Sequence, residues 1–217
     1  LAVDMTYSHT GLVMLVSGTP GEMAYTYSAD SLAVALASLQ SNGVPVPVRA
    51  AQLTLTDIAG QAQLRAASDK RHSAQTFDAA NASWLVAFDE LEKGQPVKME
   101  GALTGLSFMG TAALPQGLDL ANMTAAMGAG FAVDSTIAYA TGKQTISMSD
   151  DSGPLTVSSS SQGGDLRVAV NETMLAYSGS GRQAKVEAAG GMLPIPVSLA
   201  MENAGFNLRF PFFFRLA

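Results

Sequence analysis

Residues 163–179 read GGDLRVAVNETMLAYSG, and this stretch decides the fold class. Large apolar residues occupy every second position from Leu166 to Val170, and the alternation resumes at Leu175 after the polar NET segment. A period of two is typical of a β-strand with one buried face, and Asn is a common turn residue. The stretch therefore predicts two antiparallel strands joined by a short turn.

The same alternation recurs along most of the chain. It includes the runs around Leu53, Val97–Leu103, Ile137–Tyr139, Ile146–Met148, Ile195–Met201 and Phe206–Phe210. Seven short turn-like sequences punctuate the runs: DIAG, TGK, DDSG, SQGGD, VNET, SGSGR and ENAG. Because local connections join neighbouring antiparallel strands, we predict a mostly-β fold. The expected architecture is an antiparallel meander curved into a sandwich or an open groove.

One segment departs from this rhythm. Residues 115–131 carry apolar side chains at helical spacing, Asp119 is placed to cap a helix, and Gly128 is placed to end it. We predict one short helix near 119–128. Residues 30–40 fit both a strand and a helix, and the sequence before them favours a strand.

Two proline pairs, Pro45 with Pro47 and Pro194 with Pro196, lie in otherwise strand-like sequence. Proline lacks a backbone N–H, so two prolines at alternate positions leave one side of a strand short of donors. We predict that both pairs terminate the edges of the sheet. The alternative is a polyproline-like crossover between two sheets.

The charge composition excludes some classes of partner. Charged residues make up only 14% of the 217 residues, and 12 Lys and Arg are set against 18 Asp and Glu. The cations form no basic stripe, so we expect no binding to nucleic acid. No apolar run approaches the roughly 18 residues of a membrane-spanning helix, so we expect no transmembrane segment. The absence of cysteine excludes disulfides and thiolate sites.

The length suits a single β-rich domain over 1–217. A faint resemblance between residues 27–39, 77–91 and 163–179 leaves two duplicated β-units as an alternative. The low charge and the wealth of small residues favour an exported, periplasmic protein of bacteria whose signal peptide has been removed. We expect the sequence to be a mature or partial chain of a longer exported protein.

A search for catalytic motifs gives little. His9 and His72 have no neighbouring ligand at metal-binding spacing, and the polar sequence around His72 predicts a loop. Asp150 and Asp151 are read as turn residues. The glycine-rich SGSGR at 178–182 lacks the end of a phosphate-binding loop. We therefore predict no metal, no cofactor and no enzymatic activity; a hydrolase with dispersed carboxylates is a remote alternative.

Aromatic and methionine side chains form the remaining feature. A one-sided sheet with one helix leaves apolar surface that the sheet itself, a ligand or a partner must cover, and methionine suits adaptable apolar surfaces. We predict a protein that binds a lipid-like ligand or an envelope partner; an accessory subunit of a membrane-associated complex is the second hypothesis. The residues expected to line the apolar face are Met99, Phe108, Met123, Met127, Tyr139, Met148, Tyr177 and Phe206.

The chain also resembles a known family over about residues 25–210. The resemblance is carried by YTYSADSLAV, AQLTLTDIAG, GALTGLSFMGTAALPQGLDLANMTAAMGAGF, SSSSQGGDLRVAV, LAYSGSG and LPIPVSLAMENAGFNL. These segments are similar to alphaproteobacterial exported proteins that share the domain of unknown function 2125. The resemblance implies a periplasmic location and an export signal, and it supplies no activity or site residues.

Overall fold

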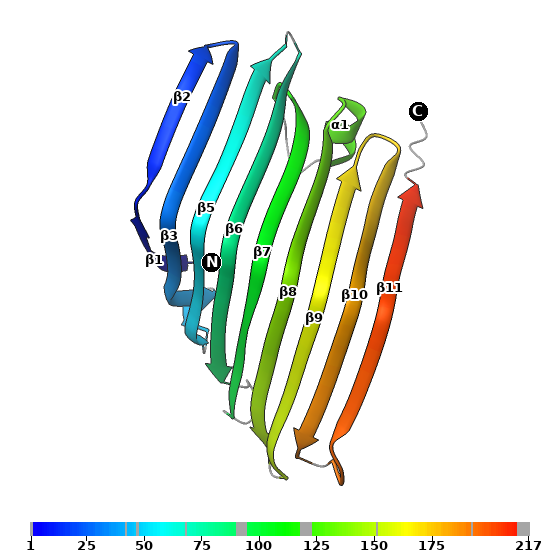
Figure 1. The fold of residues 1–217 in the computed structure, drawn as a ribbon. Coiled ribbons are helices and arrows are strands. Elements are labelled where there is room, and N and C mark those ends of the chain that lie inside the picture. Colours follow the sequence, from blue (N-terminus) through cyan, green and yellow to red (C-terminus); the bar gives the residue numbers. More distant parts are fainter. Residues whose placement is uncertain are drawn as a thin grey trace.

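A computed structural model describes residues 2–41, 43–46, 48–67, 69–89, 95–117, 123–150, 152–191 and 193–211. Within these ranges the chain forms one antiparallel sheet and one short helix (Figure 1). The strands are β1 (Ala2–Thr10), β2 (Val13–Thr19), β3 (Glu22–Ser41), β4 (Val44–Pro45), β5 (Val48–Ala66), β6 (Lys70–Asp89), β7 (Pro96–Pro115), β8 (Ala132–Asp150), β9 (Gly153–Val170), β10 (Met174–Gly190) and β11 (Val197–Pro211), and the helix is α1 (Met123–Gly128). The predicted antiparallel meander is thus confirmed, as an open sheet.

The strands follow one another in the order β1-β3-β5-β6-β7-β8-β9-β10-β11. β1 and β2 both pair with β3, one along each part of it, so together they form one edge of the sheet. The short β4 pairs with the end of β3. β11 forms the other edge and pairs with β10 alone (Figure 1).

The turn after β9 has the predicted form. The side-chain oxygen of Asn171 accepts hydrogen bonds from the backbone N–H of Thr173 at 2.9 Å and of Met174 at 3.0 Å. The Asn171 N–H donates in turn to the Met174 carbonyl at 3.0 Å. Such asparagine turns reverse the chain within a few residues, so β9 and β10 pair as immediate neighbours.

A line of directly opposed residues crosses the sheet, and we call it the crease. In every pair of neighbouring strands, residues on both sides of this line are paired in register, whereas the crease residues themselves are left out of the pairing. They are Gly11, between β1 and β2, then Asp30, Asp57, Ala80, Gly105, Ala140, Gly163, Arg182 and Asn203. Among the crease residues φ is positive in every second strand, at Gly11 (64°), Asp57 (51°), Gly105 (58°), Gly163 (62°) and Asn203 (49°).

The crease reverses the phase of the side-chain alternation. In β5, Leu55 and Ile58 are three residues apart, yet both are buried in the same cluster. An undisturbed strand would direct them to opposite faces. Because the same reversal occurs in each neighbour, one face of the sheet stays apolar from end to end. We call it the apolar face, and the other the polar face.

Most of the predicted turns were wrong for this reason. DIAG (57–60), TGK (141–143), SQGGD (161–165), SGSGR (178–182) and ENAG (202–205) lie inside β5, β8, β9, β10 and β11, at or beside the crease. Only DDSG and VNET connect strands. Glycine, asparagine and aspartate tolerate the positive φ of a turn and of a strand irregularity equally well, so the same residues serve both.

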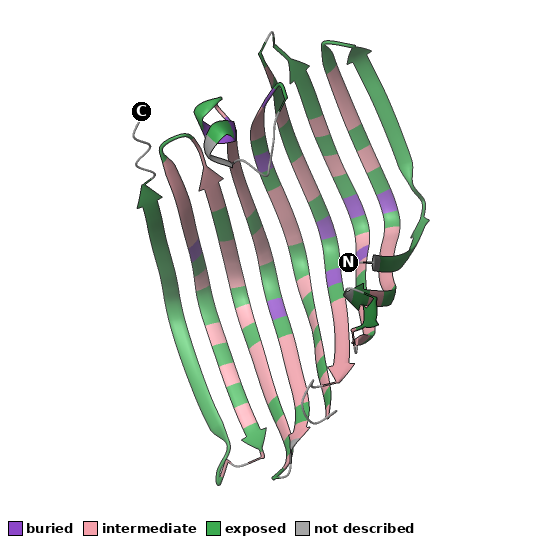
Figure 2. Ribbon diagram, turned by 180° about the vertical axis from the view of Figure 1, so that it is seen from behind, coloured by how far each residue is buried: buried purple, intermediate pink, exposed green. Residues whose placement is uncertain are grey.

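Helix α1 confirms the predicted helix in its C-terminal part. Residues 119–122, including the expected cap Asp119, lie outside the described residues. Gly130, two residues beyond the helix, has a φ of 89°, as expected of a helix stop. Ala126, Met127 and Phe131 are buried against Leu114, Val133 and Val170, so α1 covers one end of the apolar face (Figure 2). Residues 30–40 are strand, as favoured.

The proline prediction is confirmed for Pro45, which lies in β4, a two-residue strand that pairs with β3 alone, and it is corrected for Pro194 and Pro196. Pro45 pairs with Gln40 at the tip of the β3–β5 connection, and Pro194 and Pro196 lie in the connection between β10 and β11. Pro47 lies outside the described residues. The two edges, β1 with β2 and β11, contain no interior proline, so proline does not protect them. The β10–β11 connection needs no ladder donor at these positions, which explains why proline is accommodated there.

Candidate functional site

The described residues leave the apolar face largely uncovered. In the described chain, only α1 and the corner formed by β1 and the end of β3 lie over it (Figure 2). Its exposed large apolar residues include Tyr7, Met14, Val16, Leu53, Leu64, Ile137, Met148, Leu166, Val197, Leu199, Met201, Phe206, Leu208 and Phe210. Contiguous apolar patches of this extent are rare on soluble monomers and mark sites of interaction.

The total surface supports the same conclusion. A compact monomer of 22.4 kDa exposes roughly 9,400 Å². The chain exposes 14062 Å². The difference, about 4,600 Å², exists because a single sheet layer has two open faces where most domains have packed layers. Something must cover part of this area for the apolar face to be shielded from water.

Part of the crease is filled by the protein's own side chains. On the apolar face, Ala29, Leu55, Ile58, Ala79 and Ala82 form a buried cluster from β3 to β6. Tyr27, Leu32, Phe77, Leu103 and Leu106 pack against it. The alanines of this cluster leave space beside the crease on the apolar face, and the larger side chains fill that space.

The other part of the crease, from β7 to β11, is hollow. A cavity of about 520 Å³, which we call the apolar trough, lies there. It is lined by Leu103, Ile137, Tyr139, Asp165, Leu166, Gly179, Ser180, Gly181, Ala204, Gly205 and Phe206. Gly181 lies in the same row beside the crease as Ile58 of the filled part, so a ligand can approach the backbone closely at this position. The volume lies within the range of small-molecule sites, roughly 300–1,000 Å³.

Aromatic rings lie over glycines of neighbouring strands. Tyr139 covers Gly164 and Phe206 covers Gly179, each directly opposite its glycine in the register. A Cβ on either glycine would meet the ring. The Tyr139 hydroxyl also accepts a hydrogen bond from Ser161 at 3.1 Å. These contacts fix the two aromatic walls of the apolar trough in place.

The predicted lining residues separate into groups. Tyr139 and Phe206 meet in the apolar trough. Phe108 lies on the apolar face between the crease and the end of the sheet that α1 covers, and its ring covers Gly110. Tyr177 lies further along β10, with its ring 6.5 Å from that of Phe210 in an edge-on arrangement.

The methionines are not brought together. Met99 of β7 and Met148 of β8 lie on the side of the crease that is away from α1, outside the apolar trough. Met127 is buried under α1, so the protein itself covers it. Met123 begins α1, and its side chain lies outside the description. Sequence reasoning missed Gly179 and Gly181, because a glycine in SGSGR signals a turn unless the strand is known to continue.

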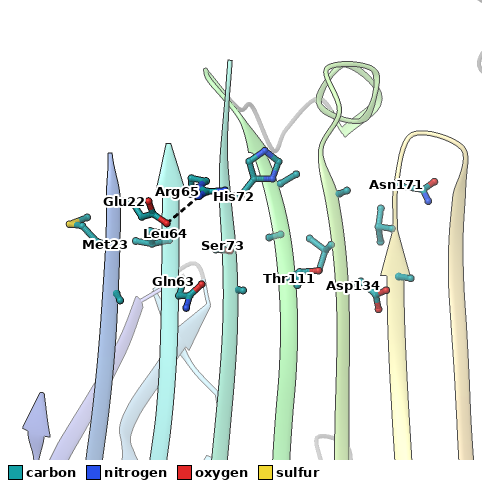
Figure 3. A pocket seen from close by; sticks show the side chains of 18 residues that line it. Glu22, Met23, Gln63, Leu64, Arg65, His72, Ser73, Thr111, Asp134 and Asn171 are labelled. Atoms are coloured by element: carbon teal, nitrogen blue, oxygen red, sulfur yellow. Dashed lines mark hydrogen bonds and ion pairs between the residues drawn. The ribbon is translucent and has the colours of Figure 1, made fainter. Parts of the chain in front are cut away.

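A second depression of about 600 Å³ crosses six strands near one end of the sheet (Figure 3). Glu22, Arg65 and His72 are among its lining residues, and Arg65 donates to Glu22 at 3.3 Å. His72 is therefore on a strand, β6, and not in the predicted loop. His9 lies on β1, so the two histidines do not share a site.

Asp134, which also lines this depression, is held by Arg167 of the neighbouring strand. Arg167 donates through Nε at 2.8 Å and through Nη2 at 2.5 Å. These hydrogen bonds lower the pKa of Asp134 despite some desolvation, and the attraction between the charges acts in the same direction. The carboxylate also raises the pKa of Arg167. A carboxylate kept ionised in this way stabilises the sheet and is a poor proton donor.

The described residues contain no group of three or more His, Cys, Asp or Glu side chains placed to hold a metal ion. None of their helices is both long and apolar enough to cross a membrane.

Comparisons with family models, with curated proteins and with solved structures found no match to this chain. The resemblance to exported proteins with the domain of unknown function 2125 stays a prediction.

Proposed function

We propose that the chain is a non-enzymatic binding protein that holds a lipid-like ligand on its apolar face. The observation that carries the proposal is the hollow part of the crease. There an apolar cavity of about 520 Å³ opens within a face whose large apolar side chains are uncovered. Ligand sites are concave, mainly apolar, and carry few polar groups.

An acyl chain suits this cavity better than a polar ligand does. Leu103, Ile137, Leu166 and Phe206 offer apolar walls, and the hydroxyl of Tyr139 is engaged with Ser161. Each buried methylene of a ligand contributes about 0.8 kcal/mol. Apolar exposure continues beyond the apolar trough toward Leu208 and Phe210, which gives room for a long or branched chain.

The proposed location is the bacterial periplasm. Low charge, absence of cysteine and the resemblance to exported proteins support this location. A carrier of apolar molecules has a role in that compartment because lipid must cross water between membranes, where free acyl chains are poorly soluble.

Filling the apolar trough tests the proposal. Gly181 is in extended backbone, and a Cβ there would have only the Gly163 carbonyl oxygen within 4 Å, at 3.8 Å. Gly181→Leu therefore fits the strand and occupies the cavity. We expect it to weaken the binding of a dansyl-labelled undecanoic acid by about tenfold or more, the equivalent of about two lost methylene contacts.

The matched control is Gln183→Leu, which adds the same side chain to the polar face of the same strand. We expect this variant to bind the labelled acid within about twofold of the unmodified protein, because it leaves the apolar trough unchanged. Equal affinity of both variants, or no binding by the unmodified protein, would contradict the proposal.

A further inference from the structure

The edge strand β11 is exposed along its whole length. All 15 residues from Val197 to Pro211 are exposed, and β10 covers only one side of the backbone. Natural proteins protect long edge strands with charged side chains, above all lysine, with proline, with bulges or by short length. β11 has no lysine, no interior proline and only the two charges of Glu202 and Arg209, and its Val197, Leu199 and Leu208 are half exposed or more.

At the crease, β11 has the same backbone conformation as the inner strands β5, β7 and β9. Positive φ occurs in the crease residues of alternate strands, and Asn203 continues this series at the edge. Gly163 in β9 has the same conformation and is flanked on both sides by strands whose crease residues, Ala140 and Arg182, have ordinary φ. If the alternation continues, a strand that pairs with the free side of β11 has ordinary φ at its crease residue, as β8 and β10 do.

The alternation excludes a second copy as the best occupant of this place. At the crease the two edges of the sheet are Gly11, which lies between β1 and β2, and Asn203 of β11, and both residues have positive φ. Pairing β11 with either edge of another copy would put two strands of the same kind side by side. Every internal pair in the sheet joins strands of opposite kinds.

We propose that β11 accepts an additional antiparallel strand from a partner protein, which extends the apolar face. Such β-strand addition draws affinity from the main-chain hydrogen bonds and specificity from alternate side chains. The partner strand has about 14 residues that alternate between apolar and small polar. Its residue opposite Asn203 has ordinary φ.

The charges of β11 define the partner further. On the polar face, Glu202 and Arg209 lie opposite the uncharged Gln183 and Ala176 of β10. A strand that fits the free side of β11 carries a cation opposite Glu202 and an acidic residue opposite Arg209. Opposite charges at these two places also fix the direction and register of the partner.

A synthetic peptide tests the proposal on the whole chain. The probe has the sequence of β10, residues 174–190, with Gln183→Lys and Ala176→Glu to match the two charges. Two isomers carry N-methyl groups on alternate residues, so each has one blocked edge. We expect one isomer to bind and to slow hydrogen exchange of β11 amides at least tenfold, and the other to bind at least tenfold more weakly.

Two further variants separate this site from the apolar trough. Asn203→Gly keeps the positive φ, and we expect unchanged peptide binding. Asn203→Val opposes it, and we expect peptide binding to fall at least fivefold. Gly181→Leu is expected to lose the labelled fatty acid and to keep the peptide, so either proposal can fail alone. Equal binding of the two N-methyl isomers, or protection of β2 in place of β11, would overturn the strand-addition proposal.

Discussion

The crease crosses two regions of the same sheet and is treated differently in each. From β3 to β6 the protein fills it with Leu55 and Ile58, while from β7 to β11 the small residues Gly181 and Ala204 leave it hollow. The backbone irregularity is the same in both regions. The difference teaches that the crease is an architectural device, and that the size of the side chains beside it decides between core and cavity.

The largest expected effect tests the filled region. Leu55 is 8% exposed, whereas Leu166 in the hollow region is 44% exposed. We expect Leu55→Ala to lower the free energy of unfolding by about 2–4 kcal/mol, because it opens a cavity in the cluster. Leu166→Ala should cost less than about 1 kcal/mol, because its side chain is already half in water. Urea unfolding of both variants measures this, and equal losses would show that the two regions do not differ.

Glycines give the next comparison. A Cβ on Gly60 would meet the ring of Tyr27, whereas a Cβ on Gly181 would make only an ordinary contact of 3.8 Å with the Gly163 carbonyl oxygen. We expect Gly60→Leu to destabilise the protein by about 1–3 kcal/mol through overpacking. Gly181→Leu should change stability by less than about 1 kcal/mol, apart from its effect on ligand binding. Thermal unfolding of both variants without ligand decides the matter; a large loss in Gly181→Leu would mean that the trough is not free space.

The crease itself is tested at Asp57, the positive-φ residue beside the filled cluster. Asp57→Gly relaxes the backbone and is expected to be neutral within about 0.5 kcal/mol. Asp57→Val should cost about 1–2 kcal/mol, because a β-branched residue resists positive φ. Chemical denaturation compares them. A Val variant as stable as the Gly variant would show that the sheet does not depend on this conformation.

The smallest effect is expected on the polar face of the hollow region. Asp134 has a lowered pKa through Arg167, so its ionised form stabilises the folded state. This contribution is complete above the ordinary aspartate pKa of about 3.9 and disappears as the pH falls through the lower folded value. Asp134→Asn should thus be slightly less stable than the unmodified protein at pH 7, and the difference should shrink as the pH falls below the ordinary aspartate pKa. A difference that does not change with pH would exclude the ion pair as its cause.

Much of the fold was readable in particular residues. The alternation around Leu166 and Val168 predicted strands, and Asn171 predicted the turn that follows. The sequence also contains the reversal of phase: apolar positions in β11 are odd up to Met201 and even from Phe206. By itself this reversal predicts a turn, because glycine-rich segments between two apolar runs look alike in a hairpin and in a creased strand.

The candidate site was less predictable. Tyr139 and Phe206 were expected on the apolar face, and they meet in one cavity. Met127 was expected there too but is buried under α1, since the position of a helix over a sheet depends on contacts far apart in the chain. The glycines of the trough floor carried no sign of a site, because their importance lies in what their neighbours leave empty.

The sequence by itself determined that the chain forms strands, that one face of each is apolar, and where the β9–β10 connection reverses. These are local properties, because alternation and turn chemistry depend on residues close in sequence. Only the tertiary structure decided that the strands continue through their glycines, that the crease residues align across eight strands and the β1–β2 link, and that β11 stands at an edge. Register and edges depend on which distant backbone groups find hydrogen-bond partners, and no short stretch of sequence contains that information.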